Sequence, residues 1–302
     1  MKHKIDPTVD CVFKAIFGSE ENKNVCIHFL NSILELKGKD KIRSITIKNP
    51  YNQRDFKKDK LSIIDVRVED EKQRNYQIEI QVSNHAGLGQ RILYTWCRIY
   101  HGLLKKGLAF SELKPVTSIW VLKEPMFAIK DYYLDFCLYN RKHNIVLTDH
   151  ISINLVQLSK YEAVNNEPGN KEKWIYLLKE GKNMDVDQLP PELNIPEIRQ
   201  AAEVMRNFSE REEDYLLYES RLDAVRELAT WQYYMEVERK AREKAEMKLE
   251  QAFLSLQQER QTREQAALQA ALILERERQA REQEKEKFIE LLKKANIDPD
   301  QL

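Results

Sequence analysis

The chain has 302 residues, of which 32% are charged, and its 49 Lys and Arg residues balance its 49 Asp and Glu residues. This length allows one substantial core plus an extension, because domains average about 100–200 residues. A formal net charge of zero excludes the global basic charge that is typical of many nucleic-acid-binding proteins.

The charge is nevertheless uneven along the chain. Residues 37–60 hold nine basic residues and three acids. Taken singly, these lysines are typical of a solvated loop. As a group, which includes Lys57 and Lys58, they predict a rim that guides DNA phosphates.

Cysteine usage and hydropathy bear on the compartment. Cys11, Cys26, Cys97 and Cys137 form no CxxC pair and have mostly apolar neighbours, so we expect reduced, buried thiols and neither a disulfide framework nor a zinc site. The sequence has no apolar run of membrane-spanning length, and its N-terminus lacks the apolar core of a signal peptide. We therefore predict a cytoplasmic protein with no membrane partner.

The first 180 residues show alternating helix and strand patterns. The predicted elements are, in order, helices over 9–17 and 22–36, strands over 43–48, 61–70 and 76–83, a helix over 90–107, strands over 116–122, 132–139 and 151–158, and a helix over 171–180. The strand over 116–122 is nearly all apolar, which favours a central position covered on both faces. This order predicts a mixed α/β core of packed layers.

The composition changes beyond Pro196, where Gly and Pro are absent until Pro299. Residues 198–208 and 210–231 predict helices that pack on the core, and one long charged helix follows from residue 232. Its apolar residues at heptad spacing are Ala245, Leu249, Ala252, Leu256, Ala266, Ala270, Ile273, Ala280 and Leu291, interrupted by Glu259, Arg263 and Glu277. The alternatives are a coiled coil and a solvated single helix held by i,i+4 charge pairs.

The stretch 61–83 places an acid in the middle of each of two neighbouring strands. Because strand side chains alternate, Asp65 lies on one face of the first strand, while Gln77, Glu79 and Gln81 share a face of the second. Carboxylates on rigid strands bind Mg²⁺ and leave other positions to water and phosphate. The same alternation is also typical of an ordinary hairpin with one solvent-facing side.

Several segments occur together in a defined order: DPTVDCVFKAIFG, IDVRV, YQIEIQ, QRILYTWCRIY and KEKWIYLLKE, of which the last ends at residue 180. In this order they resemble the PD-(D/E)xK nuclease superfamily. More narrowly, they resemble the Rpn family of recombination-promoting nucleases and putative transposases, whose members also carry variable helical tails.

The resemblance implies a restriction-endonuclease-like αβββαβ core with a mixed sheet, and a metal-dependent DNA endonuclease linked to recombination or transposon-like mobility. Asp65 and Glu79 would ligate one or two Mg²⁺ ions, with Mn²⁺ as an alternative, and the backbone carbonyl of Ile80 would also reach the metal. Gln81 stands where the superfamily usually has Lys. Its amide cannot act as a base near neutral pH, but it can orient a water.

Further contacts follow from the same resemblance. Gln90 and Tyr94, four residues apart on one helix face, would touch DNA, although a tyrosine there is more often a core residue. Arg91 and Lys14 would meet phosphates or simply face solvent. Asp10 is either a helix-start acid or an accessory acid of the site.

These interpretations divide the chain into a nuclease domain over 1–185, a helical extension packed on the core over 186–231, and a long charged helix or coiled coil over 232–302 that could form a homo-oligomer. A second hypothesis is a catalytically weak or inactive nuclease-fold protein that acts as a DNA-binding or coiled-coil interaction module.

Overall fold

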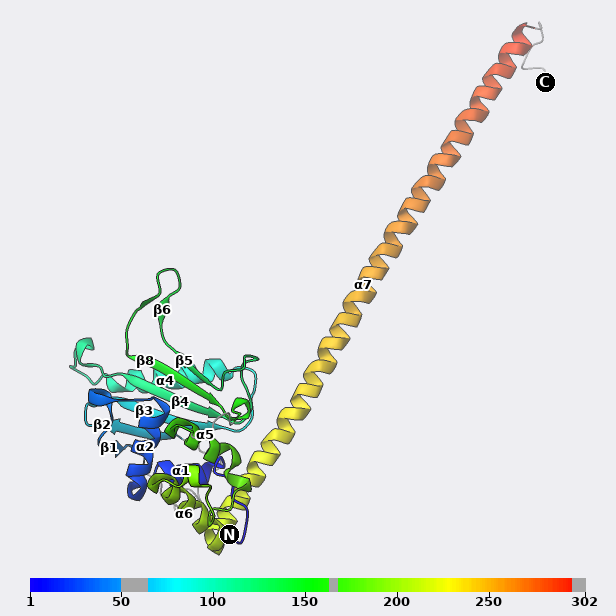
Figure 1. Cartoon of the computed structure of the whole chain (residues 1–302). Coiled ribbons are helices and arrows are strands. Elements are labelled where there is room, and N and C mark those ends of the chain that lie inside the picture. Colours follow the sequence, from blue (N-terminus) through cyan, green and yellow to red (C-terminus); the bar gives the residue numbers. More distant parts are fainter. Residues whose placement is uncertain (50–64, 163–167, 295–302) are drawn as a thin grey trace. The chain divides into compact units, whose positions relative to one another are not determined.

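The computed structural model describes residues 1–49, 65–162 and 168–294 of the chain (Figure 1). The chain divides into two compact units, Met1–Gln232 and Tyr233–Leu302. Within the described ranges, no helix combines the length and the apolar composition that crossing a membrane requires.

The first unit is built on a six-stranded mixed sheet in the order β1-β2-β3-β4-β8-β5. The first three strands pair antiparallel, β3, β4 and β8 pair parallel, and β5 returns antiparallel at the edge. Their bounds are Ile45–Ile47 (β1), Asp65–Asp70 (β2), Asn75–Gln81 (β3), Val116–Leu122 (β4), Tyr133–Phe136 (β5) and Ile151–Gln157 (β8). The predicted mixed α/β class with an αβββαβ core is confirmed.

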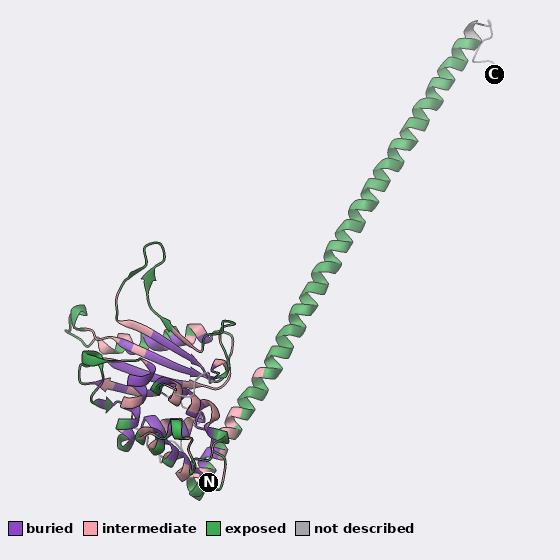
Figure 2. Ribbon diagram, in the orientation of Figure 1, coloured by how far each residue is buried: buried purple, intermediate pink, exposed green. Residues whose placement is uncertain are grey.

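Helices cover both faces of this sheet, so β4 is central and buried as its apolar run predicts. One face packs Ile78 and Val121 against helices α1, α2, α5 and α6. The other face packs Trp120 and Leu155 against Ile92 of α4. The helix bounds are Asp10–Phe17 (α1), Lys23–Ile33 (α2), Leu88–Leu103 (α4), Asn170–Glu180 (α5) and Pro196–Glu210 (α6). Figure 2 shows the buried residues concentrated in the sheet and in the helix faces turned toward it.

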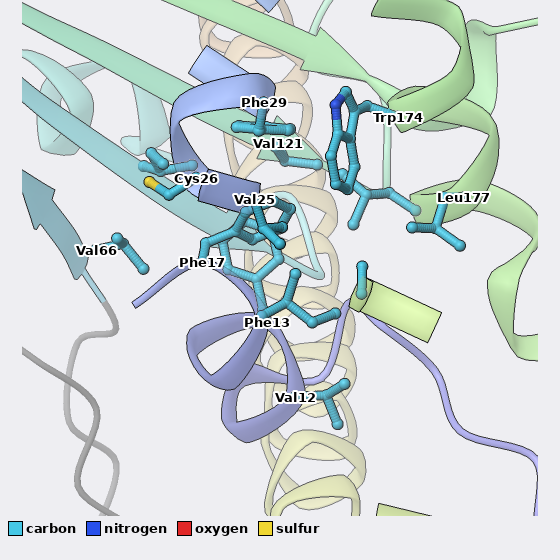
Figure 3. Close-up of a cluster of buried hydrophobic side chains, with 14 of the residues drawn as sticks. Val12, Phe13, Phe17, Val25, Cys26, Phe29, Val66, Val121, Trp174 and Leu177 are labelled. Atoms are coloured by element: carbon cyan, nitrogen blue, oxygen red, sulfur yellow. The ribbon is translucent and has the colours of Figure 1, made fainter. Parts of the chain in front are cut away.

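The larger core lies between the sheet and the N-terminal helices (Figure 3). Phe13 and Phe17 of α1 contact each other with ring centroids 4.8 Å apart, and Phe17 also meets Phe29 and Trp174. Helix α2 ends earlier than the predicted 22–36 because Glu35 adopts a left-handed conformation, φ 51°, that a right-handed helix cannot continue through.

The predicted strand over 132–139 is wrong in its second half. Strand β5 ends at Phe136, and the chain then forms a separate two-stranded ribbon from β6 (Tyr139–Asn140) and β7 (Ile145–Val146). The backbone N–H of Leu147 donates to the carbonyl of Leu138 at 2.9 Å. Residues 138–140 therefore pair with residues 145–147, which the alternation of apolar residues alone did not predict.

The prediction of four buried cysteines is half wrong. Cys11 and Cys26 are buried, and burial raises the pKa of Cys11 and raises that of Cys26 to about 12. Cys97 and Cys137 are exposed, because one lies on the solvent side of α4 and the other enters the ribbon. All four thiols are free.

The long helix α7 (Glu212–Lys294) begins within the first unit. There Tyr218 is buried, and its hydroxyl accepts a hydrogen bond from the Asp6 N–H at 3.1 Å. In the second unit every described side chain from residue 233 to residue 291 is exposed. Two of the residues that interrupt the predicted heptads pair with each other, since Arg263 donates to Glu259 at 2.6 Å.

Candidate active site

The two predicted acids meet in the pairing of β2 with β3. Asp65 and Glu79 are direct Cα partners in this antiparallel pair, and Glu79 belongs to the face of the sheet that α4 covers. Glu79 is in turn the parallel partner of Trp120 on β4. The side chain of Asp65 lies outside the described residues, as do Lys57 and Lys58 of the basic stretch.

Glu79 is buried, with 1% of its surface exposed, and a chain of neutral hydrogen bonds holds it. Its Oε1 accepts from Gln77 Nε2 at 2.8 Å, and Gln77 Oε1 accepts from the Ser118 hydroxyl at 3.3 Å. The indole Nε1 of Trp120 then donates to Ser118 at 2.9 Å. This network fixes the orientation of the Glu79 carboxylate on the sheet.

The surroundings of Glu79 suit a bound cation. Across the described parts of the chain, no basic side chain forms an ion pair with Glu79. A buried carboxylate without a countercharge is costly, and its charge is normally offset by a cation or lost by protonation. Among the described residues, no group of three His, Cys, Asp or Glu side chains could hold a metal ion. The side chain of Asp65 is not among those described, and its Cα pairs with that of Glu79. Among the described side chains, Glu79 supplies one uncompensated carboxylate, which is a suitable oxygen ligand for a divalent cation.

Gln81 is held by protein groups at both ends of its amide. Its Nε2 donates to the carbonyl of Ser83 at 2.8 Å, and its Oε1 accepts from Arg91 Nη1 at 3.0 Å. The guanidinium carbon of Arg91 lies 5.7 Å from the centre of the Trp120 ring, a cation–π contact. A fixed positive charge from α4 therefore stands over the same face of the sheet as Glu79.

The start of α4 presents two other predicted residues to solvent. Gln90 is exposed, and Tyr94 is 69% exposed, so Tyr94 is not a core residue. The helix instead buries Leu88, Ile92 and Trp96. Gln90 and Tyr94 therefore lie on the exposed surface of α4 and not in the core.

Asp10 and Lys14 lie on α1, which covers the face of the sheet opposite to α4. Asp10 Oδ1 accepts from the Cys11 N–H at 2.7 Å, and its Oδ2 lies 3.8 Å from Arg221 of α7. Burial raises the pKa of Asp10, and the charge of Arg221 opposes that rise. Asp10 is thus paired within the fold, and its role as an accessory acid stays a prediction, as does phosphate binding by the half-buried Lys14.

The supporting network of Gln77, Ser118 and Trp120 was not predicted as part of the site. The available signal was a polar residue, Ser118, inside the apolar run of β4. Sequence spacing cannot show that this serine pairs with Gln77, because the two are 41 residues apart and meet only through the parallel register of β3 and β4.

The mixed sheet, with acids opposed on its second and third strands and helices on both faces, defines a layered α/β protein. A sequence model of the PD-(D/E)XK nuclease family transposases matches residues 7–235, and the chain belongs to that family. The match extends past the predicted nuclease domain, through α6 and into α7. Comparisons with curated proteins and with solved structures find no match.

Proposed function

We propose that this protein is a divalent-cation-dependent DNA endonuclease that hydrolyses phosphodiester bonds, and that it serves recombination or transposon-like mobility. One observation carries the proposal: Asp65 opposes a buried Glu79 whose hydrogen-bond partner in the described structure is a neutral amide. Membership of a nuclease family supports the reaction class. PD-(D/E)XK nucleases generally use divalent metal ions, which supports the cation dependence. We propose Mg²⁺, with Mn²⁺ as an alternative.

Asp65, Glu79 and the carbonyl of Ile80 are the groups that would hold the ion. A bound Mg²⁺ would lower the pKa of a ligated water and offset charge on the scissile phosphate. Gln77 fixes the orientation of the Glu79 carboxylate that would hold the ion, because its amide donates to one carboxylate oxygen.

Arg91 is the residue that we assign to the phosphate. Arg91 is half-buried, and its guanidinium is bound to Gln81 and lies over Trp120, so little side-chain freedom is lost when it meets an anion. In this arrangement Gln81 acts as a positioning residue for Arg91, and the charge that a lysine would supply at position 81 comes from the next helix. Gln90 and Tyr94 extend the DNA contact along the exposed face of α4.

The test is the nicking of supercoiled plasmid by the purified full-length protein with Mg²⁺, with Mn²⁺ and with EDTA. We expect cutting that needs the metal and falls by a factor of about 100 or more in Asp65→Ala, because several kcal/mol of charge stabilisation would be lost. Glu69→Ala is the matched control. Glu69 lies on the same face of β2 four residues away, and there it pairs with Lys48 at 3.0 Å.

Equal loss of cutting in Glu69→Ala and Asp65→Ala would show that the acid pair is not the site. A wild-type protein that binds DNA but cuts with neither metal would favour the second candidate, a DNA-binding module without catalysis. The observation behind that candidate is Gln81, whose amide carries no charge and is bound at both ends by Ser83 and Arg91.

We also propose that residues 232–302 associate with a second copy of the chain. Support comes from the heptad positions and from exposed apolar side chains in this unit, such as Leu249, Leu256 and Ile273. Sedimentation of the full chain over a range of concentrations tests this proposal. A monomer at all concentrations would leave α7 as a single helix held by pairs such as Glu238 with Arg242.

A further inference from the structure

The ribbon of residues 136–147 is a second feature of the first unit that points to a ligand. It extends from the edge of the six-stranded sheet (Figure 1). Tyr139 pairs with Val146 and Asn140 with Ile145. Outside the ribbon, this segment has no sheet partner among the described strands, since β6 and β7 form a two-stranded sheet of their own.

The tip of the ribbon is held in a defined conformation. Asn140 Oδ1 accepts from the N–H groups of Lys142 and His143 at 3.0 and 2.9 Å. The Asn144 N–H donates to the Asn140 carbonyl at 2.8 Å, and Asn144 has a positive φ of 54°. Asparagine tolerates this left-handed conformation better than most residues. The turn therefore presents its side chains on a fixed backbone.

The charge of the ribbon has one sign. Arg141, Lys142 and His143 occupy the turn and are all exposed, and residues 136–147 contain no acid. In a chain whose net charge is zero, the turn is therefore a local concentration of positive charge on a projecting element. Such a concentration attracts a polyanion.

The strands of the ribbon carry apolar side chains that face solvent. Ile145 is 63% exposed and Leu147 is 75% exposed, and Leu138, Tyr139 and Val146 are each about half exposed. Figure 2 shows this whole segment as exposed. Leu138, Ile145 and Leu147 lie on one face of the ribbon and Tyr139 and Val146 on the other, so both faces present the exposed apolar side chains that are typical of an interaction site.

We propose that this ribbon binds duplex DNA, with Arg141 and Lys142 on the phosphates and the apolar side chains beside them in a groove. Two strands about 4.8 Å apart fit a major groove about 12 Å wide, and apolar wedges next to cationic residues are a known means of binding the minor groove. A second copy of the chain would account for the apolar side chains but not for an acid-free cationic tip. DNA accounts for both.

The ribbon lies away from the acid pair. Across the sheet, Phe136 of β5 pairs with Ile153 of β8, which pairs with Ser118 of β4, which pairs with Gln77 of β3. The ribbon therefore leaves the sheet three strands away from β3 and two residues along the strand direction from Glu79. At about 4.8 Å per strand and 3.3 Å per residue, its base is about 16 Å from Glu79. This corresponds to about five base pairs of duplex. The inference rests on the proposed function, because one DNA molecule would contact both the ribbon and the Asp65 and Glu79 pair.

The experiment measures binding, not cutting. The full chain is titrated in EDTA against labelled duplexes of about 10 and about 30 base pairs at several salt concentrations near 0.1 M. The test variant is Arg141→Ala/Lys142→Ala. The charge-matched control is Lys2→Ala/Lys4→Ala, which removes two exposed lysines from the N-terminus. Each variant is first checked for an unchanged unfolding transition.

We expect the ribbon variant to bind the longer duplex about tenfold more weakly, with a salt slope smaller by about 2, since each lost phosphate contact removes about 0.9. The affinity of the control variant for both duplexes should change much less. Binding by the ribbon variant equal to that of wild type would overturn the inference.

A second variant, Ile145→Ser/Leu147→Ser, tests whether the ribbon binds a second copy of the chain instead of DNA. Weaker binding of the longer duplex with an unchanged sedimentation coefficient supports DNA as the ligand. Loss of a dimer with unchanged DNA binding would assign the ribbon to contact between copies and overturn the inference. The two proposals fail separately: ribbon-dependent binding without any cutting contradicts only the proposed catalysis, and metal-dependent cutting with ribbon-independent binding contradicts only the role of the ribbon.

Discussion

Two buried acids, Asp70 at the end of β2 and Glu79 near the end of β3, have opposite surroundings. Asp70 accepts hydrogen bonds from the N–H groups of Lys72 and Arg74 at 2.9 and 2.8 Å. It also accepts from the Arg74 guanidinium at 2.6 Å and from the Tyr76 hydroxyl at 3.2 Å. Glu79 accepts from the amide of Gln77, and none of the described basic side chains forms an ion pair with it.

This difference separates an acid that holds the fold together from an acid that suits a ligand. A buried carboxylate is stable when charged donors compensate it, and Asp70 obtains those donors from its own turn. The pKa of the neighbouring Tyr76 is raised, because burial and the charge of Asp70 both disfavour the phenolate. Glu79 has an oriented carboxylate without such compensation, which leaves its charge available to a cation.

The largest expected effect is on cutting by Glu79→Gln, which keeps the side-chain shape and the hydrogen bond from Gln77 but removes the charge. We expect plasmid nicking to fall by a factor of about 100 or more. The free energy of unfolding in EDTA should stay the same or rise, because a buried uncompensated charge is removed. A clear loss of stability would show that Glu79 is a structural acid like Asp70.

The reciprocal substitution is Asp70→Asn. It leaves Arg74 without its anionic partner and weakens the bonds to two backbone N–H groups, so we expect a loss of about 3 kcal/mol in the free energy of unfolding. Urea denaturation measures this loss. The specific nicking activity of the folded fraction should match wild type, and a selective loss of activity would contradict the contrast between the two acids.

A smaller effect is expected for Arg91. Arg91→Ala should weaken DNA binding and nicking by about tenfold, since one charged phosphate contact is worth about 1–2 kcal/mol. Arg91→Lys should recover part of the binding because it keeps the charge but loses the fork geometry and the stacking near Trp120. Equal activity of the alanine and lysine variants would exclude a role for the charge.

The smallest effect concerns Asp6, which pairs with Lys123 at 2.8 Å. Burial raises the pKa of Asp6, but hydrogen bonds from Lys123 and Thr8 outweigh burial, so its folded-state pKa lies below the usual value. Asp6 therefore contributes stability above about pH 4 and loses it as the pH falls through the lowered folded-state pKa. Because Lys123 is partly exposed, the contribution should be below about 1 kcal/mol.

Acid unfolding of wild type and of Asp6→Asn measures this contribution. The variant should show a flatter decline in stability below about pH 4. A decline as steep as that of wild type would assign the acid sensitivity to other carboxylates.

Much of the fold could be predicted from local patterns. The helical stripe before Gly18 and the apolar run of β4 specify an element and its buried face within a few residues, because periodicity follows directly from backbone geometry. The acid positions Asp65 and Glu79 follow from the same alternation. The ribbon could not be predicted in this way, because its two strands are short and residues 138–139 fall within the apolar alternation of the predicted strand over 132–139.

The sequence by itself determined the class of fold, the family and the face of each strand on which the acids lie. Only the tertiary structure decided that Asp65 stands opposite Glu79, that Ser118 and Gln77 brace that acid, and that Arg91 stands close by. The physical reason is that a local pattern sets which side of an element is apolar. Strand register and contacts between distant residues are set by packing of the whole core.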